Sequence, residues 1–270
     1  MKLTRYPETY NPILEYWQAI ENGRETVSLK VQKTYRHVVE QLGATDSEFY
    51  YSPRRANHVL EFFENYCHHS KGKAGGQLVK LELWEKALLA TVFGFIDRQY
   101  REAILIVGKK NGKSLLASGV GLYLQLADGE AGPEVYAVAT KRDQAKIIWQ
   151  EAKRMVKKSP ALCRRMRSLV AELDSDFNDG VFKPLASDSD TLDGLNIHGA
   201  MMDEIHQWKS GRALYDIIAD GVTAREQPLI LITSTAGTIR EDIYDQKYEE
   251  AERIINGYED PDGYHDPRRI

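Results

Sequence analysis

Hydrophobic and polar residues alternate along this chain with two different periods, and the changes of period divide it into segments. In the first ~75 residues the apolar positions follow the 3.6-residue spacing of an amphipathic helix. After the start signal Ser52-Pro53, the residues on this spacing are Ala56, Val59, Leu60, Phe63, Tyr66 and Cys67. The glycine-rich stretch Lys71–Gly76 breaks the pattern. We therefore predict an N-terminal helical subdomain over residues 1–75 and a separate domain over residues 76–256.

From residue 83 onward, helical and extended patterns take turns. Helical spacing covers residues 83–92, the segment after residue 113, and the segment after Thr140, which is the predicted N-cap. The apolar stripe of this last helix is Ala145, Ile148, Trp149, Ala152, Met155 and Val156. Short apolar runs typical of strands lie at 104–107, 134–139, 169–173, 181–185, 200–202 and 229–232. This alternation predicts an α/β fold with a mostly parallel central sheet flanked by helices, whose sites lie at the carboxyl ends of the strands.

Composition places the chain among globular proteins. Hydrophobic residues make up 42% and charged residues 28% of its 270 residues, which excludes wholesale disorder. No apolar stretch approaches the ~18 residues of a membrane span, and Met1–Pro7 lacks a signal-peptide core. The only cysteines, Cys67 and Cys163, are far apart, which fits a reducing compartment. We expect a cytosolic protein that does not associate with membranes.

The net charge of −4 is not that of a typical nucleic-acid-binding protein, but the basic residues are unevenly distributed. Between residues 153 and 167 the sequence has no acidic residue and seven basic ones, which are Lys153, Arg154, Lys157, Lys158, Arg164, Arg165 and Arg167. This segment is either a surface that attracts phosphates or a solvated helix face.

The apolar run 104–107 ends in a glycine-containing loop, Gly108–Ser114, which closes with Gly-Lys-Ser. Such a loop binds nucleotides because its backbone N–H groups surround the β-phosphate, its lysine reaches the β and γ oxygens, and its hydroxyl binds Mg²⁺. The usual pattern G-x-x-x-x-G-K-[ST] has glycine where this chain has Val107. The flanking strand and helix patterns favour a variant phosphate-binding loop over an ordinary lysine-rich turn. Hydrolysis of a nucleoside triphosphate is therefore the first hypothesis.

Two further segments place polar side chains at the ends of predicted strands. Asp203-Glu204 follows the run 200–202, and hydrolysis of this kind uses one carboxylate to orient Mg²⁺ and often a second to polarise water. The pair would meet the loop if the two preceding strands are neighbours, although an isolated Asp-Glu is usually a surface feature. Thr233, Ser234 and Thr235 follow the run 229–232, and they are either sensors of the γ-phosphate or a polar turn.

In their order and spacing, these segments resemble the ATPase domain of the large terminase subunit of tailed bacteriophages, the DNA-packaging motor. The resemblance extends from about residue 52 to the end of the chain. It rests on six matches: Phe62–Glu64 with His68–Gly76, Leu81–Glu85 ahead of Phe93–Phe95, Gly108–Ser114, Ala139–Ala145, Met202–Glu204 and Thr233–Gly237. It implies a P-loop NTPase fold that binds ATP and Mg²⁺.

The resemblance also implies roles for individual residues. The nucleotide-binding residues would be Trp84, Glu85, Gly108, Lys109, Lys110, Asn111, Gly112, Lys113, Ser114 and Leu115. Within this set Lys113 would bind phosphate, and Ser114 together with Asp203 would hold the metal. Glu204 would be the catalytic base, and Thr233, Ser234 and Thr235 would match the motif that couples hydrolysis to DNA movement. An arginine from one subunit would complete the neighbouring site, for which the candidates are Arg142, Arg212 and Arg225.

Two positions depart from the family pattern. Lys109 stands where the family usually has arginine, and lysine keeps the charge but cannot make a planar bidentate phosphate contact. Glu85 stands where the family usually has an adenine-contacting glutamine, and a carboxylate has no donor for the adenine N7. These changes concern the phosphate contact and the base selectivity of the predicted site.

The expected partners follow from the resemblance alone. They are double-stranded DNA, the portal protein of the procapsid, the small terminase subunit and further copies of this chain in a ring of five. The expected location is the cytoplasm of the infected bacterial host, with transient binding at the procapsid portal. Family members carry a nuclease domain after the ATPase domain, so we expect no nuclease site in these residues and interpret 257–270 as a linker or tail.

Two other functions fit the same motifs. A helicase-like ATPase that remodels nucleic acids would share the chemistry of the two carboxylates but would separate strands. A nucleotide-dependent interaction module would use its helical first ~75 residues to dock a partner. The leading hypothesis remains a DNA-translocating ATPase.

Overall fold

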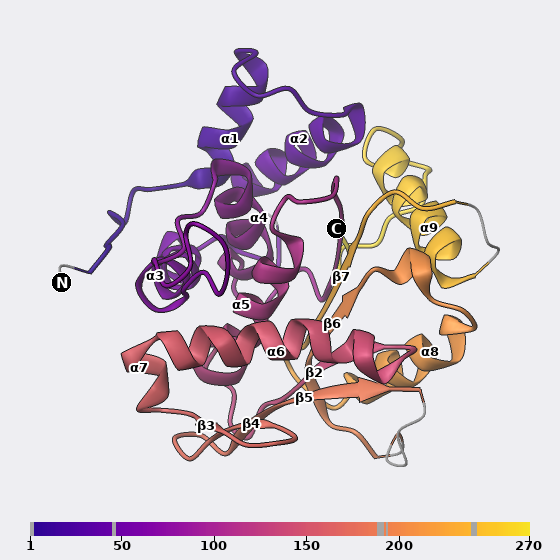
Figure 1. The fold of residues 1–270 in the computed structure, drawn as a ribbon. Coiled ribbons are helices and arrows are strands. Elements are labelled where there is room, and N and C mark those ends of the chain that lie inside the picture. The colour runs from indigo at the N-terminus through magenta and orange to yellow at the C-terminus, as the bar shows by residue number, and fades with distance from the viewer. Residues whose placement is uncertain (1–2, 45–46, 188–191, 193, 239–241) are drawn as a thin grey trace. The chain divides into compact units, whose positions relative to one another are not determined.

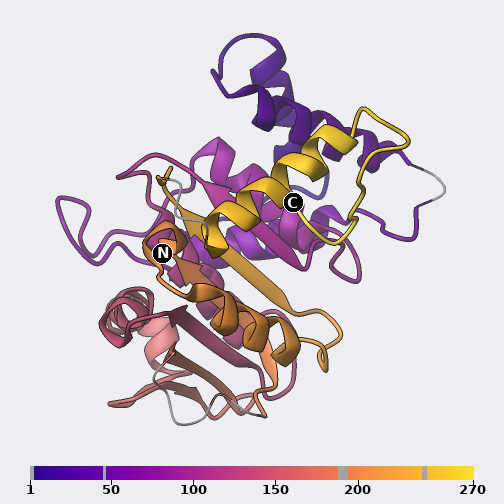
Figure 2. The same cartoon turned by 90° about the vertical axis from the view of Figure 1, so that its right-hand side faces the viewer.

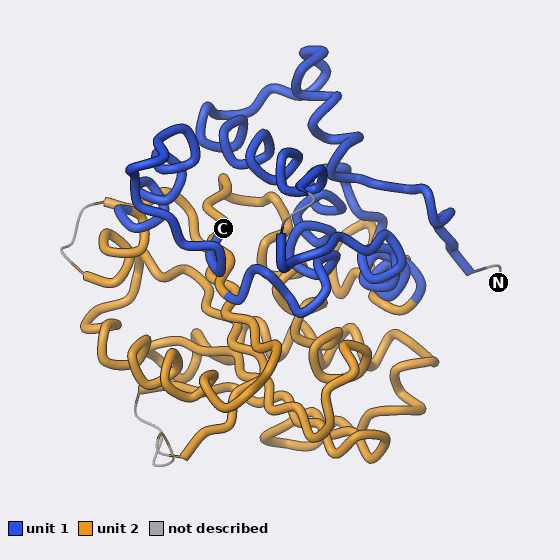
Figure 3. Tube along the Cα trace, turned by 180° about the vertical axis from the view of Figure 1, so that it is seen from behind, with its two compact units in different colours: residues 1–65, 80–101, 249–270 blue, residues 66–79, 102–248 orange. Residues whose placement is uncertain are grey.

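The computed structural model describes residues 3–44, 47–187, 192, 194–238 and 242–270. The chain forms two compact units, each assembled from separate stretches of sequence (Figure 3). Unit 1 comprises residues 1–65, 80–101 and 249–270, and unit 2 comprises residues 66–79 and 102–248. The predicted functional division into 1–75, 76–256 and 257–270 stays a prediction.

Unit 1 is helical. It contains α1 (Pro12–Glu21), α2 (Leu29–Gly43), α3 (Pro53–Tyr66), α4 (Leu83–Gly94) and the second half of α9 (Ile243–Gly257). Side-chain caps start two of these helices, because Asn11 accepts from the Ile13 amide at 3.0 Å and Ser28 from the Val31 amide at 3.3 Å. The apolar faces meet in a core formed by Ile13, Tyr16, Ile20, Tyr35, Val38, Ala56, Ala87 and Ala90.

Residues after α9 pack within unit 1. Tyr258 stacks on His37 of α2 with ring centroids 3.9 Å apart, and Glu259 forms ion pairs with Lys33 and Arg36. These contacts bind the stretch that we interpreted as a tail to the outer face of α2.

Unit 2 is built on a seven-stranded sheet (Figure 1). Its strands are β1 (Glu102–Ile106), β2 (Glu134–Ala139), β3 (Arg167–Ser168), β4 (Leu173–Ser175), β5 (Gly180–Ala186), β6 (Ile197–Asp203) and β7 (Leu229–Ser234). The strand order is β1-β7-β6-β2-β5-β4-β3, and the first five of these strands are parallel. The short β3 and β4 are antiparallel, as is the β4–β5 pair. The predicted mostly parallel sheet is therefore confirmed.

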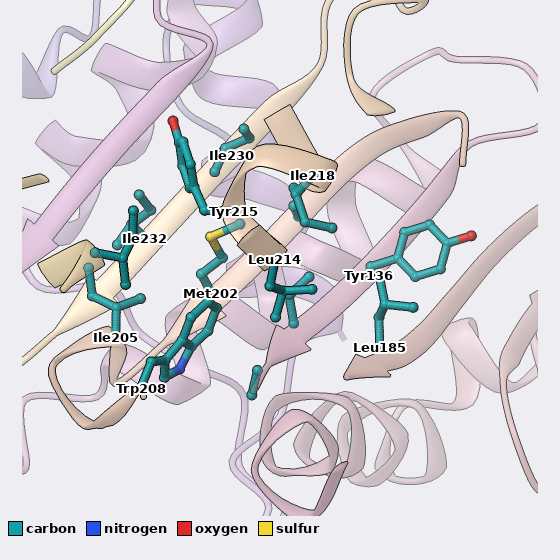
Figure 4. Packing of buried hydrophobic residues seen from close by; sticks show 14 of the residues in the cluster. Tyr136, Leu185, Met202, Ile205, Trp208, Leu214, Tyr215, Ile218, Ile230 and Ile232 are labelled. Carbon is teal, nitrogen blue, oxygen red and sulfur yellow. The ribbon is translucent and has the colours of Figure 1, made fainter. Parts of the chain in front are cut away.

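Helices cover both faces of this sheet. They are α5 (Lys113–Leu126), α6 (Arg142–Lys158), α7 (Pro160–Cys163) and α8 (Gly211–Gly221), with the 3₁₀ turn η1 (Ile205–Gln207) after β6. α5 and α6 pack against β2, β5 and β6, and the side view in Figure 2 shows α8 against the strands. Tyr136 and Met202 from the strands and Leu214 and Ile218 from α8 belong to one buried cluster, drawn in Figure 4.

A buried ion pair joins the first strand of unit 2 to its last helix. The Lys247 ammonium donates to the Glu102 carboxylate at 3.1 Å, and both side chains are almost fully buried. The Tyr215 hydroxyl donates to the same carboxylate and lies beside the ammonium. Because unpaired charges are costly in an apolar interior, this trio fixes the start of β1 to α8 and α9.

The sequence prediction of the 200–202 strand was too short. β6 begins at Ile197 and includes both residues that interrupted the apolar run. His198 is accommodated inside the fold because its Nε2 pairs with Asp128 at 2.7 Å. Gly199 leaves room for α5, since a Cβ there would lie 2.6 Å from the end of the Leu124 side chain.

Two other local predictions were wrong. The N-cap of α6 is Lys141 rather than Thr140, and it makes no side-chain capping bond. The run 169–173 is not one strand but mainly a tight turn between β3 and β4, closed by the Leu169 amide on the Glu172 carbonyl at 2.9 Å. Val170 at its tip is 96% exposed, so hydrophobicity alone misled the assignment.

Candidate functional site

The loop between β1 and α5 is exposed and has a backbone conformation that suits anion binding. Lys110 and Gly112 have left-handed φ values of 69° and 76°, and the lysine is an uncommon occupant of that region. Asn111 Nδ2 donates to the Gly108 carbonyl at 3.1 Å and closes the turn. Residues 108–112 are exposed, and α5 begins immediately after them. The first-turn amides of α5 and its dipole therefore favour an anion at this loop.

Lys113, the first residue of α5, reaches across to the acidic pair that follows β6. Its ammonium donates to Asp203 Oδ1 at 3.1 Å and also contacts Glu204 Oε1. Burial alone would lower the pKa of Lys113, but the hydrogen bond to Glu204 and the charge of Asp203 outweigh it, and the pKa is raised. The lysine is therefore a fixed positive charge between two carboxylates.

Asp203 is the centre of this arrangement. Ser114 Oγ donates to its Oδ2 at 2.9 Å, and Thr233 Oγ1 donates to its Oδ1 at 2.7 Å. The Glu204 amide also donates to Oδ1, at 2.9 Å. The carboxylate is thus oriented by side chains from α5 and β7 as well as by its own backbone.

The route by which these groups meet differs from the prediction. β1 and β6 are not neighbours, because β7 lies between them in the sheet. The hydroxyl residues at the end of β7 consequently stand between the loop and the acidic pair. Thr233 is fully buried there, and its carbonyl accepts from the Glu204 amide at 2.8 Å.

Glu204 has a strained backbone and a crowded carboxylate. Its φ and ψ of 53° and 42° lie in the left-handed region, which non-glycine residues seldom occupy. Besides Lys113, its carboxylate meets Thr235 Oγ1 at 3.4 Å and His206 Nδ1 at 3.0 Å. The backbone turn at Glu204 and η1 fold His206 back onto the carboxylate. Sequence reasoning missed this histidine, although the spacing Asp-Glu-x-His was visible in residues 203–206.

Other predicted site residues lie outside this cluster. Lys109 is exposed in the loop, Leu115 is half-buried in α5, and Arg142 is exposed at the start of α6. Trp84 and Glu85 belong to unit 1, where Glu85 accepts from the Glu82 amide at 2.9 Å and caps α4. Burial raises the pKa of Glu85.

The candidate arginines differ in their hydrogen bonds and in their exposure. Arg225 donates to the carbonyls of Asn196, Ala131 and Gly132 and pairs with Glu130 at 2.8 Å. Through these bonds Arg225 connects loops at the amino ends of the strands. Arg212 is exposed on α8, as Arg142 is on α6.

Some side chains of the basic segment 153–167 make contacts within unit 2. Lys153 lies over the Trp149 ring and donates to the Leu169 carbonyl, and Arg167 pairs with Asp174. The exposed basic residues at the end of α6 and just after α7 include Lys157, Lys158 and Arg164. In the part of the chain that the structure covers, no helix combines the length and hydropathy needed to cross a bilayer.

Comparison with known proteins identifies the family of this chain. The family described as "Terminase large subunit, ATPase domain" matches residues 83–253. The large terminase subunit of Enterobacteria phage HK97 is 28% identical over 193 residues, which are 67% of this chain and 36% of that protein. The chain thus spans little more than a third of this curated relative.

A solved structure from phage HK97 supports the fold. The crystal structure of the HK97 bacteriophage large terminase has a TM-score of 0.65 at 24% identity, over 80% of this chain and 43% of that one. The Thermus phage P74-26 large terminase ATPase domain gives a TM-score of 0.43 at 19% identity, over 53% and 63% of the two chains. Since the family match covers more than half of the sequence and includes both the phosphate loop and the acidic pair, the chain belongs to the family of terminase large subunit ATPase domains.

Proposed function

We propose that this chain binds ATP with Mg²⁺ at the end of β1 and β6, hydrolyses it, and uses the energy to move double-stranded DNA into a viral procapsid. The observation that carries the proposal is a chain of side-chain contacts, in which Lys113 donates to both Asp203 and Glu204 and Ser114 donates to Asp203. These are the four side chains that a P-loop ATPase needs for phosphate, metal and water.

The donor set fits Mg²⁺ bound together with a nucleotide. Ser114 Oγ and Asp203 Oδ2 lie 2.9 Å apart and are hard oxygen donors, which Mg²⁺ prefers. Among the described residues no group of three or more His, Cys, Asp or Glu side chains could hold a metal by itself. Phosphate oxygens and water would complete the shell, as is usual for Mg²⁺ in nucleotide sites. Bound there, the ion would neutralise charge on the phosphates.

The protein side chains then divide the remaining work. Lys113 exchanges its carboxylate partners for phosphate oxygens, and the amides at residues 108–114 contact the phosphates. Glu204, released from the lysine, accepts a proton from the attacking water. Thr233 contacts the Asp203 carboxylate, Thr235 contacts the Glu204 carboxylate, and Ser234 contacts His206. Through these contacts a change at the phosphates would reach the end of β7.

The finer roles are proposed from the family pattern. Lys109 and Lys110 would add positive charge beside the phosphates, and Trp84 and Glu85 would contact the adenine. Arg142 would act on the nucleotide of a neighbouring copy, and its exposure at the start of α6 is compatible with that role. Arg225 is a poor candidate for the same role because its guanidinium already bonds to Glu130 and to the Gly132 carbonyl.

The cellular role is proposed from the relative that is a terminase large subunit. We propose that copies of this chain form a ring of five on the portal of a procapsid in the host cytoplasm, together with the small terminase subunit. Nuclease activity would require residues beyond this ATPase domain.

The first test is ATP turnover measured with and without double-stranded DNA. We expect hydrolysis that requires Mg²⁺ and is lost in Lys113→Ala. Turnover that persists in this variant would contradict the proposed site. ATP-dependent strand separation would instead favour the helicase-like alternative, since a packaging motor leaves the duplex paired.

A further inference from the structure

His206 occupies a bridging position between the proposed base and β7. Its Nδ1 lies 3.0 Å from Glu204 Oε2 and 3.0 Å from Ser234 Oγ. Both partners are therefore within hydrogen-bonding distance of a single nitrogen atom. The sequence motifs that led to the proposed site did not include this residue.

The hydrogen-bond inventory decides which atom carries the proton. The Ser234 hydroxyl donates to the Thr235 carbonyl at 3.1 Å, so its oxygen is left to accept from the imidazole. A carboxylate accepts only, and an unprotonated Nδ1 would direct its lone pair at Glu204. Nδ1 therefore carries a proton, and this proton has two competing acceptors at equal distance.

The imidazole is held in place by the segment after β7 and by α9. A Cβ on Gly237 would lie 2.6 Å from the His206 Cβ, so the backbone of this loop packs directly on the histidine. The Gly237 amide donates to the Tyr244 hydroxyl at 3.2 Å, and the Tyr244 ring meets the imidazole edge-on at 6.3 Å. A small displacement of the loop would therefore move the histidine.

The geometry points to His206 as a positioning residue for Glu204, which holds the base by a proton shared between Glu204 and the end of β7. This inference rests on the proposed function and deepens it. When Lys113 turns toward phosphate, Glu204 loses its strongest partner, and the Nδ1 proton keeps the carboxylate oriented for water. When the Ser234–Gly237 segment shifts, the proton transfers its hydrogen bond to Ser234 and the base loses its orientation.

Two variants of nearly identical shape separate this role from simple packing. In His206→Asn the amide nitrogen can occupy the position of Nδ1 and donate to Glu204, whereas His206→Leu has a similar volume and no donor. Steady-state ATP turnover with Mg²⁺ and ATP affinity are measured for the wild-type chain and both variants, and thermal unfolding shows whether each is folded.

We expect His206→Leu to lower kcat by about 10- to 100-fold, the effect of losing one hydrogen bond to a charged group. The KM should change by less than about threefold, because the proposed role of the histidine is to orient the base and not to bind the nucleotide. His206→Asn should recover most of kcat at the same unfolding temperature as His206→Leu. Equal kcat values for the Asn and Leu variants would overturn the inference.

The wild-type measurement separates the two proposals. If the wild-type chain hydrolyses ATP and His206→Leu matches it, only the positioning role is refuted. If the wild-type chain shows no turnover, the proposed function is refuted and the inference with it.

A spectroscopic readout does not depend on turnover. Nitrogen-15 NMR of the imidazole groups in the nucleotide-free chain, assigned by the signal that His206→Asn removes, reports which ring nitrogen is protonated. We expect a proton on Nδ1, in the neutral or the charged ring. A neutral ring protonated at Nε2 alone would overturn the inference.

Discussion

Replacing Glu204 by glutamine tests whether its ion pair with Lys113 holds the lysine back from phosphate. In the proposed function, Lys113 gives up a carboxylate partner before it binds phosphate. Glu204→Gln removes the charge and keeps the shape, so it should abolish turnover while making ATP bind more tightly. A simple loss of a catalytic group would change turnover alone.

The exposure of the two side chains sets the size of the effect. Lys113 is 10% and Glu204 22% exposed, so their ion pair lies between the surface and buried classes. Surface pairs contribute about 0–1 kcal/mol, and breaking a buried pair costs about 3–5 kcal/mol. An intermediate value of about 1–2 kcal/mol corresponds to about 5- to 30-fold tighter ATP binding. Loss of the general base should lower kcat by about 100-fold or more.

Isothermal titration with ATP and Mg²⁺ measures the affinity, and phosphate release measures turnover. Glu226→Gln is the matched control, since it removes the same charge from an exposed residue in the loop that enters β7, at the end of the strand away from the site. Its affinity should equal that of the wild type. Equal or weaker binding by Glu204→Gln would refute the restraint, and unchanged turnover would show that the base is misassigned.

Three further predictions follow from other features. Lys113→Ala should abolish ATP binding as well as hydrolysis, because Lys113 is the ammonium group that contacts Asp203. Retained ATP affinity in a titration would contradict this role. If Lys157 and Lys158 contact DNA, replacing both by alanine should weaken duplex binding and reduce the slope of log affinity against log salt by about 2. An unaltered slope would show that these lysines only form a solvated helix face. Lys247→Met should leave the Glu102 charge buried without its lysine and destabilise unit 2 by about 3–5 kcal/mol in urea unfolding, with part of the loss recovered when Glu102→Gln is added. Wild-type stability in the single variant would disprove that account.

Periodicity predicted most of the fold because the buried elements are long or strongly patterned. The stripe of α6 and the run before the phosphate loop could be assigned from local residues alone. Periodicity failed where a tertiary partner overrides local preference. His198 lies inside β6 because its Nε2 pairs with Asp128, and Val170 is exposed because a tight turn holds it away from the sheet.

The candidate site was predictable in part for a similar reason. A phosphate loop and an acidic pair have fixed spacings, so Lys113, Ser114, Asp203 and Glu204 were visible in the sequence. The strand order was not visible in the sequence, so the position of β7 between the phosphate loop and the acidic pair could not be predicted. The contact between Glu204 and His206 depends on a left-handed backbone at a non-glycine residue, for which the sequence carries no local signal.

The ion pair of Glu102 with Lys247 lies where the chain enters and leaves the main segment of unit 2. Glu102 is the first residue of that segment, and Lys247 is the second to last. One buried pair of charges therefore holds the start of this segment next to its end. Pulling the two ends of this segment apart would require the buried ion pair to break.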